Sequence, residues 1–101
     1  MIMRLWHGRT APEDFETYTD FMREKAAPDY ASVEGNNGCY FLRRLDDDAG
    51  HFLLVTLWAS MDAVKAFAGP EPEIAKYYPE DDALLLEKEK TSQLYEVFHQ
   101  A

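Results

Sequence analysis

The stretch His51-Phe52-Leu53-Leu54-Val55-Thr56-Leu57-Trp58 is almost wholly apolar and rich in residues that favour β-strands. Its length fits a strand better than an independent helix. Successive side chains of a strand point to opposite faces, so alternate residues from Phe52 to Trp58 share one face and those from His51 to Leu57 share the other. Because neither face is polar, we predict that both sides of the sheet are covered.

The composition indicates one globular domain spanning residues 1–101. Hydrophobic residues make up 47% of the chain and aromatic residues 14%, which is enough for a core. The net charge of −9 disfavours binding to nucleic acid or to an anionic membrane. The single cysteine, Cys39, excludes an intrachain disulfide. With no apolar run of membrane-spanning length and no secretory signal, we expect a cytoplasmic protein.

The remaining elements follow from local patterns on either side of this stretch. A first strand is predicted from Ile2 to His7, ending at Gly8, and a helix after Pro12 is predicted to end at Ala27 because Pro28 follows. Further strands are predicted over 39–45 and 94–99, and a helix over 61–68 that Ser60 caps and Gly69 stops. We interpret residues 80–82 as a solvated acidic loop and 74–78 as room for one more helical turn.

The order strand, helix, strand, strand, helix, strand is the ferredoxin-like α+β arrangement, with both helices on one face of an antiparallel sheet. The other face would expose more apolar surface than monomers usually leave bare. We therefore predict a homodimer in which the second subunit covers that face.

The segment from Thr56 to Ser60, followed by the short helix to Ala68, resembles the strand-to-helix signature of the antibiotic biosynthesis monooxygenase superfamily. The turn at residues 35–38 and the final strand with Tyr95-Glu96-Val97 fit the same superfamily. The resemblance implies a dimeric α/β barrel, in which two ferredoxin-like sheets pack together. It also implies an activity among those of its members, which include cofactor-independent oxygenases of aromatic polyketides, quinol oxygenases and heme-degrading enzymes.

The chain departs from the heme-degrading members of that superfamily. Those members share an Asn on the first strand, a Trp after the third strand and a His on the following helix. Trp58 matches the Trp, but the first strand has Trp6 and His7, and residues 61–78 contain no His. Heme degradation of that type is therefore not expected.

The predicted site is a pocket between the sheet and the helices. His7 is the predicted general base, because imidazole titrates near working pH, and Trp58 is predicted to stack a planar substrate. If His7 instead points into the dimer barrel, Trp6 takes its place and the base is a Tyr or absent. The other predicted lining residues are aromatic or apolar: Trp6, Phe21, Met22, Tyr40, Phe67, Tyr77 and Tyr78. Each also has a purely structural interpretation as a core residue.

Two adjacent arginines, Arg43 and Arg44, are predicted to point to opposite faces, so that one could anchor an anion in a pocket.

The three histidines lack metal-ligand spacing, and no Gly-rich phosphate-binding loop is present. We therefore expect no metal, flavin or nicotinamide cofactor. The leading hypothesis is a cofactor-independent monooxygenase acting on a small aromatic or quinol-like substrate. The alternative is a non-catalytic dimeric module of the same fold that binds a small apolar ligand or has a structural role.

Overall fold

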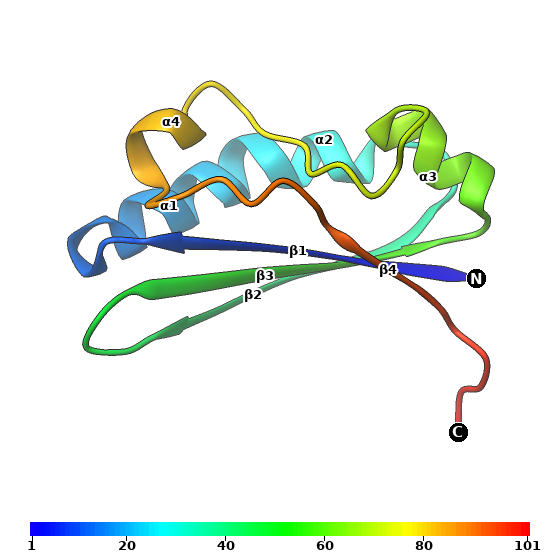
Figure 1. Cartoon of the computed structure of the whole chain (residues 1–101), viewed down its shortest axis with the longest axis horizontal. Coiled ribbons are helices and arrows are strands. Elements are labelled where there is room, and N and C mark those ends of the chain that lie inside the picture. The colour runs from blue at the N-terminus through cyan, green and yellow to red at the C-terminus, as the bar shows by residue number, and fades with distance from the viewer.

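A computed structural model describes the whole chain, residues 1–101, as a four-stranded antiparallel sheet with helices on one side (Figure 1). The strands are β1 (Ile2–Thr10), β2 (Asn36–Leu45), β3 (Gly50–Trp58) and β4 (Gln93–Glu96), in the spatial order β2-β3-β1-β4. The helices are η1 (Pro12–Asp14), α1 (Phe15–Phe21), η2 (Met22–Ala26), α2 (Ala27–Ala31), α3 (Met61–Ala68) and α4 (Asp81–Leu84). This is the predicted ferredoxin-like α+β fold.

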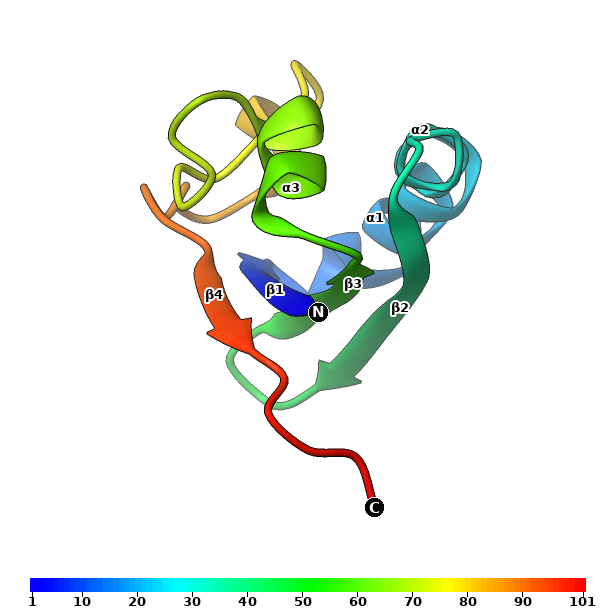
Figure 2. The ribbon, with the colours of Figure 1, turned by 90° about the vertical axis from the view of Figure 1, so that its right-hand side faces the viewer.

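The two central strands, β1 and β3, pair along their whole length, from Ile2 opposite Trp58 to Thr10 opposite Gly50. Burial alternates strictly along β3, where every second residue from Gly50 to Trp58 is buried. The buried set faces the helices, which lie in one layer above the sheet (Figure 2). This face of the sheet therefore carries the hydrophobic core.

The opposite face of the sheet, which we call the open face, has no helix over it. Figures 1 and 2 show only the C-terminal tail on that side. Apolar and aromatic side chains from all four strands nevertheless line it: Met3, Leu5, Tyr40, Leu42, Leu53, Val55, Leu57 and Tyr95. Tyr40 is 59% exposed and Tyr95 56% exposed. Both faces of the 51–58 strand are therefore apolar in the structure, and the cover of the open face by a second subunit stays a prediction.

The first helical layer is longer than predicted. We expected a helix end at Ala27, but the chain stays helical through Pro28 to Ala31. The reason is the π-helical segment η2, in which the Ala27 N–H bonds to the carbonyl of Met22, five residues back. A proline clashes with the carbonyl four residues before it in a regular α-helix, and this wider turn accommodates the ring.

The connection from β3 to α3 forms as predicted. Ser60 has extended backbone angles, and its side chain accepts a hydrogen bond from the Ala63 N–H. Gly69 ends the helix at φ 101°, in a region that residues with a side chain rarely adopt. These two caps fix the direction in which the chain leaves Trp58.

Three strand boundaries differ from those predicted. β1 continues past Gly8 to Thr10, and β2 begins at Asn36 with a bulge between Asn36 and Gly38. The Asn36 side chain accepts a bond from the Gly38 N–H and donates one to the Tyr30 carbonyl, so the predicted turn is built into the strand. β4 is shorter than expected and ends at Glu96.

The segment between α3 and α4 has no regular structure, so the helical turn predicted at residues 74–78 is absent.

The prediction of a solvated acidic loop at residues 80–82 is wrong for Asp81, which begins α4 and is 1% exposed. Its carboxylate accepts a hydrogen bond of 2.7 Å from the Tyr18 hydroxyl and another of 2.7 Å from the Tyr78 N–H. None of the helices combines the length and the hydropathy that a membrane-spanning segment needs.

These contacts predict that Asp81 links α4 to α1 and thereby stabilises the folded chain. Replacing Asp81 with Ala leaves the buried Tyr18 hydroxyl and the Tyr78 N–H without their acceptor, which costs about 3 kcal/mol in the free energy of unfolding. The neighbouring Asp82 is exposed and pairs only with Lys88, so Asp82→Ala should change it by less than about 0.5 kcal/mol. Urea unfolding followed by circular dichroism measures both, and equal losses in the two variants would contradict this role.

Candidate functional site

The space predicted for the pocket, beside Trp58, is filled by side chains. Trp58 is 0% exposed, and its indole N–H donates to the Thr56 hydroxyl at 2.8 Å. Its ring stacks on Phe67 with centroids 5.2 Å apart, and Phe67 in turn packs on Tyr30 at 4.7 Å. Trp58 is therefore a core residue in this structure.

The predicted lining residues divide between the two faces of the sheet. Phe21 packs between Tyr18 and Tyr78, and Tyr77 packs edge-on against Trp6. These residues, together with Met22, Trp58 and Phe67, lie on the helix side. Tyr40 does not, because it pairs with Val55 and faces the open side. Its prediction as a pocket residue is corrected for this reason.

His7 also lies on the open face, so the structure does not bring the predicted base to Trp58. Trp6 and His7 are adjacent in β1, and Trp6 occupies the helix side with 3% exposure. Nδ1 of His7 bonds to the Glu89 carboxylate, and its ring stacks on His51 with centroids 6.1 Å apart. Trp6 therefore takes the helix-side position, as predicted for the case in which His7 points away from the helices.

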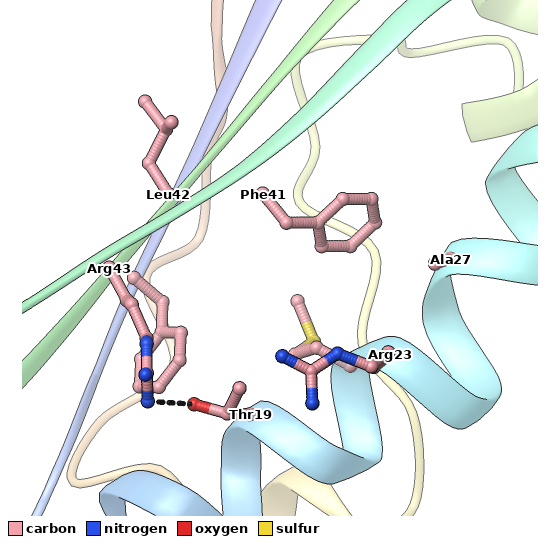
Figure 3. Close-up of a pocket in the computed structure, with 8 residues that line it drawn as sticks. Thr19, Arg23, Ala27, Phe41, Leu42 and Arg43 are labelled. Carbon is pink, nitrogen blue, oxygen red and sulfur yellow. Dashed lines mark hydrogen bonds between the residues drawn. The ribbon is translucent and has the colours of Figure 1, made fainter.

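A groove does open on the helix side, at the edge formed by β2 (Figure 3). Its volume is about 220 Å³. One wall comes from α1, η2 and α2, and the other from β2 and β3. Eight residues line it: Thr19, Met22, Arg23, Ala27, Phe41, Leu42, Arg43 and Phe52. Met22 is the one predicted pocket residue among them.

Two guanidinium groups line the groove, and Figure 3 shows Arg43 reaching from β2 to Thr19 and Arg23 coming from the helix opposite. Arg43 donates to Thr19 Oγ1 at 3.1 Å and to Glu16 Oε1 at 2.8 Å. Arg23 has only Asp20 at 3.6 Å, on an exposed surface. Apolar walls with a few polar groups are typical of small-molecule sites. The groove therefore suits a flat apolar ring that carries negative charge.

The prediction that Arg43 and Arg44 point to opposite faces is confirmed. Arg44 pairs with Asp46 at 3.3 Å, beside His51. Sequence reasoning missed Arg23, Phe41 and Phe52 as groove residues. The alternation of Phe41 with Arg43 along β2 was the available signal, whereas the position of Arg23 depends on the π-helical turn.

No phenol on the helix side can serve as a base at neutral pH. Burial raises the pKa of Tyr30 to about 12 and the pKa of Tyr77 to about 12. Burial and the Asp81 carboxylate raise the pKa of Tyr18 further. Burial raises the pKa of Tyr78 as well, so all four phenols stay protonated at neutral pH and none can act as a base. No group of three or more His, Cys, Asp or Glu side chains is arranged to hold a metal ion.

No protein family profile and no curated protein sequence matches this chain. Two solved structures share its fold. A variant of MhuD, determined with two manganese protoporphyrin IX molecules bound per active site, is 17% identical with a TM-score of 0.63, covering 100% of this chain and 98% of its own. SnoaB, a cofactor-independent oxygenase from Streptomyces nogalater, is 17% identical with a TM-score of 0.57, covering 98% and 94%. The predicted resemblance is confirmed as a likeness of fold.

The environment of Cys39 predicts an unreactive thiol. Burial raises its pKa to about 11, so the thiol stays protonated until the pH approaches that value. At pH 8 its alkylation by iodoacetamide should be slower than that of free cysteine by about a hundredfold, in line with the lower thiolate fraction. Mass spectrometry of timed samples measures the rate, with the urea-unfolded chain as control. Equal rates for the folded and unfolded chains would contradict the prediction.

Proposed function

We propose that this protein is a cofactor-independent oxygenase whose substrate is a small aromatic phenol or quinol bound in the groove between η2 and β2. The single observation that carries the proposal is the groove itself, which Arg23 and Arg43 line together with Phe41 and Phe52. The fold shared with SnoaB, described as a cofactor-independent oxygenase, adds support.

The arginines supply what such a reaction needs from the protein. A positive charge within a few ångströms favours the ionised form of a bound phenol and lowers its pKa. The groove is open to solvent at the β2 edge, so the released proton can pass to water without a protein base. This explains how the chemistry proceeds although His7 lies on the other face of the sheet.

The reaction balances with molecular oxygen as the oxidant. The bound anion gives one electron to O₂, and the resulting superoxide and substrate radical combine at a ring carbon to form a peroxide. The peroxide is then protonated. It loses water, to which the same ring carbon gives up its remaining hydrogen, and a carbonyl group is left at that carbon. One oxygen atom enters the product and the other leaves as water. The guanidinium groups stabilise the negative charge through these steps.

The MhuD structure contains bound protoporphyrin. A heme cofactor, however, does not fit the residues of this chain. The helix side offers no histidine, because His7 and His51 lie on the open face and His99 lies in the tail. Tyr30 and Tyr77 are held protonated by burial. The groove therefore offers neither a histidine nor a tyrosinate to ligate the iron, and we derive no step through heme.

The second candidate is a non-catalytic dimeric module of the same fold that binds a small ligand or serves a structural role. The complete enclosure of Trp58 and the lack of a proton-accepting general base in the groove favour it. Under this alternative the groove binds the same class of flat anion without consuming oxygen.

We also propose that the protein works as a homodimer through its open face. Leu53, Val55 and Leu57 form an apolar row on β3, flanked by exposed Tyr40 and Leu42 on β2 and by Tyr95 on β4. Burying such a face against a second copy removes a large apolar area from water, at about 25 cal/mol per Å². The sheet faces would then lie back to back, with the grooves on the outer helix sides.

Oxygen uptake tests the catalytic proposal. Wild-type protein should consume oxygen with anthrone or with a benzoquinol. Replacing Arg43 with Gln should lower kcat/KM by about tenfold to a hundredfold, since a charge-assisted contact to the anion is lost. Arg44→Gln is the matched control, because the adjacent guanidinium lies on the open face and should leave turnover unchanged. Binding of these compounds without oxygen uptake by the wild type would instead support the non-catalytic module.

Light scattering at micromolar concentration tests the dimer. Replacing Leu53 with Asp places a charge in the centre of the open face, and burying it unpaired costs several kcal/mol. We expect Leu53→Asp to be a folded monomer and the wild type a dimer. Leu86→Asp, at an exposed leucine outside the open face, should remain dimeric. A monomeric wild type would contradict the proposal.

A further inference from the structure

Arg4 is a buried cation in the core of the helix side. It lies in β1 opposite Thr56 and is 1% exposed. Its Nε donates to the Pro72 carbonyl at 3.3 Å, and its Nη2 donates to the Ile74 carbonyl at 3.2 Å. The edge of the guanidinium formed by these two nitrogens is the one that matches both oxygens of a carboxylate.

No carboxylate compensates this charge. Arg4 takes part in none of the nine ion pairs of the chain, while every other arginine has an acidic partner. Both of its carbonyl contacts exceed the 2.7–2.9 Å expected for a charge-assisted bond. Burial lowers the pKa of Arg4, yet a guanidinium remains protonated in proteins. The Tyr30 hydroxyl and the Phe67 ring also lie near the guanidinium, but both are neutral groups, so the buried charge has no counter-charge and is an expensive feature for a core.

Two further buried donors, at neighbouring positions of the sheet, also lack partners. The indole N–H of Trp6 and the hydroxyl of Ser92 are buried without a hydrogen bond. Trp6 is the next helix-side residue along β1, and Ser92 directly precedes β4. The Ser92 N–H donates to the Glu73 carbonyl, between the two carbonyls that Arg4 contacts. Residues 72–74 therefore border both Arg4 and Ser92.

We infer that Arg4 forms a carboxylate-binding site that the carbonyls of Pro72 and Ile74 fill in the ligand-free protein, with the Trp6 indole and the Ser92 hydroxyl as neighbouring donors. A carboxylate is the group whose two oxygens a guanidinium edge binds best, and each of the three donors can bond to an anion. The site is separate from the groove at β2, so it stands without the proposed oxygenase activity.

The surroundings indicate that the carboxylate is attached to an aromatic ring. The Phe67 ring centroid lies 5.9 Å from Cζ of Arg4, and the Trp58 ring stacks on Phe67. Lys76 places a second cation 4.3 Å from the Phe67 centroid, its own partner being Asp29 at 3.3 Å. The covering segment, residues 69–76, has no helix or strand and lies above β1 and β4 (Figure 2). It can therefore shift to admit a ligand with less loss of structure than α3 could.

Thermal unfolding with and without benzoate tests the site, because a ligand that binds only the folded state raises the unfolding temperature. Benzyl alcohol serves as the neutral analogue and sodium sulfate as a non-planar anion. The variants are Arg4→Met, which keeps the length of the side chain, Arg4→Lys, which keeps the charge without the paired edge, and Arg9→Met. Arg9 lies on the same strand but faces the open side, where it pairs with Glu87.

We expect benzoate to stabilise the wild type and Arg9→Met saturably, and benzyl alcohol and sulfate to have no such effect. Arg4→Met and Arg4→Lys should weaken the apparent affinity for benzoate at least tenfold. Without ligand, Arg4→Met should be at least as stable as the wild type, since the uncompensated charge is gone. An undiminished response to benzoate in both Arg4 variants would overturn the inference. A wild type whose unfolding temperature does not change with benzoate would also overturn it. So would an Arg4→Met protein that unfolds at a lower temperature than the wild type, because Arg4 would then have a purely structural role.

Discussion

The alternation of side chains along β1 and β3 is the constraint on which the rest of this structure depends. Each residue of these central strands belongs to one face or the other, and the chain provides helices for only one face. Trp6, Leu54 and Trp58 are thereby committed to the core, and His7 and Leu53 to the open face. The position of the candidate groove, the proposed surface for a second subunit and the burial of Arg4 all follow from this division.

The helix side is organised by aromatic rings and a few buried polar groups. One row of rings runs from Phe41 through Tyr30 and Phe67 to Trp58, and it closes the space that a ligand could otherwise occupy beside Trp58. The groove lies where this row ends, at the β2 edge. The π-helical turn at η2 contributes to it, since Met22 and Arg23 line the groove. Such turns occur often at functional sites because they redirect side chains out of the regular helical spacing.

The sequence was sufficient to predict the order of elements, the two apolar faces of β3 and the caps of α3, because each depends on residues close together in the chain. It could not assign His7 to a face, since both faces of β1 carry apolar residues. The burial of Asp81 was missed because its partner Tyr18 lies 63 positions away. The helix through Pro28 was missed because a proline normally argues against it, and only the π-helical turn before it removes the clash.

We propose that small-molecule chemistry takes place on the helix side at the β2 edge and not on the open face with His7. A ¹H–¹³C NMR titration with 1,8-dihydroxyanthraquinone, a stable flat phenol that resembles an oxidised product, tests this most directly. Binding in the groove predicts the largest shifts at the Met22 methyl and the Phe41 ring, with the His7 and His51 rings unchanged. Shifts confined to His7, His51 and Leu53 would place the ligand on the open face and contradict the account.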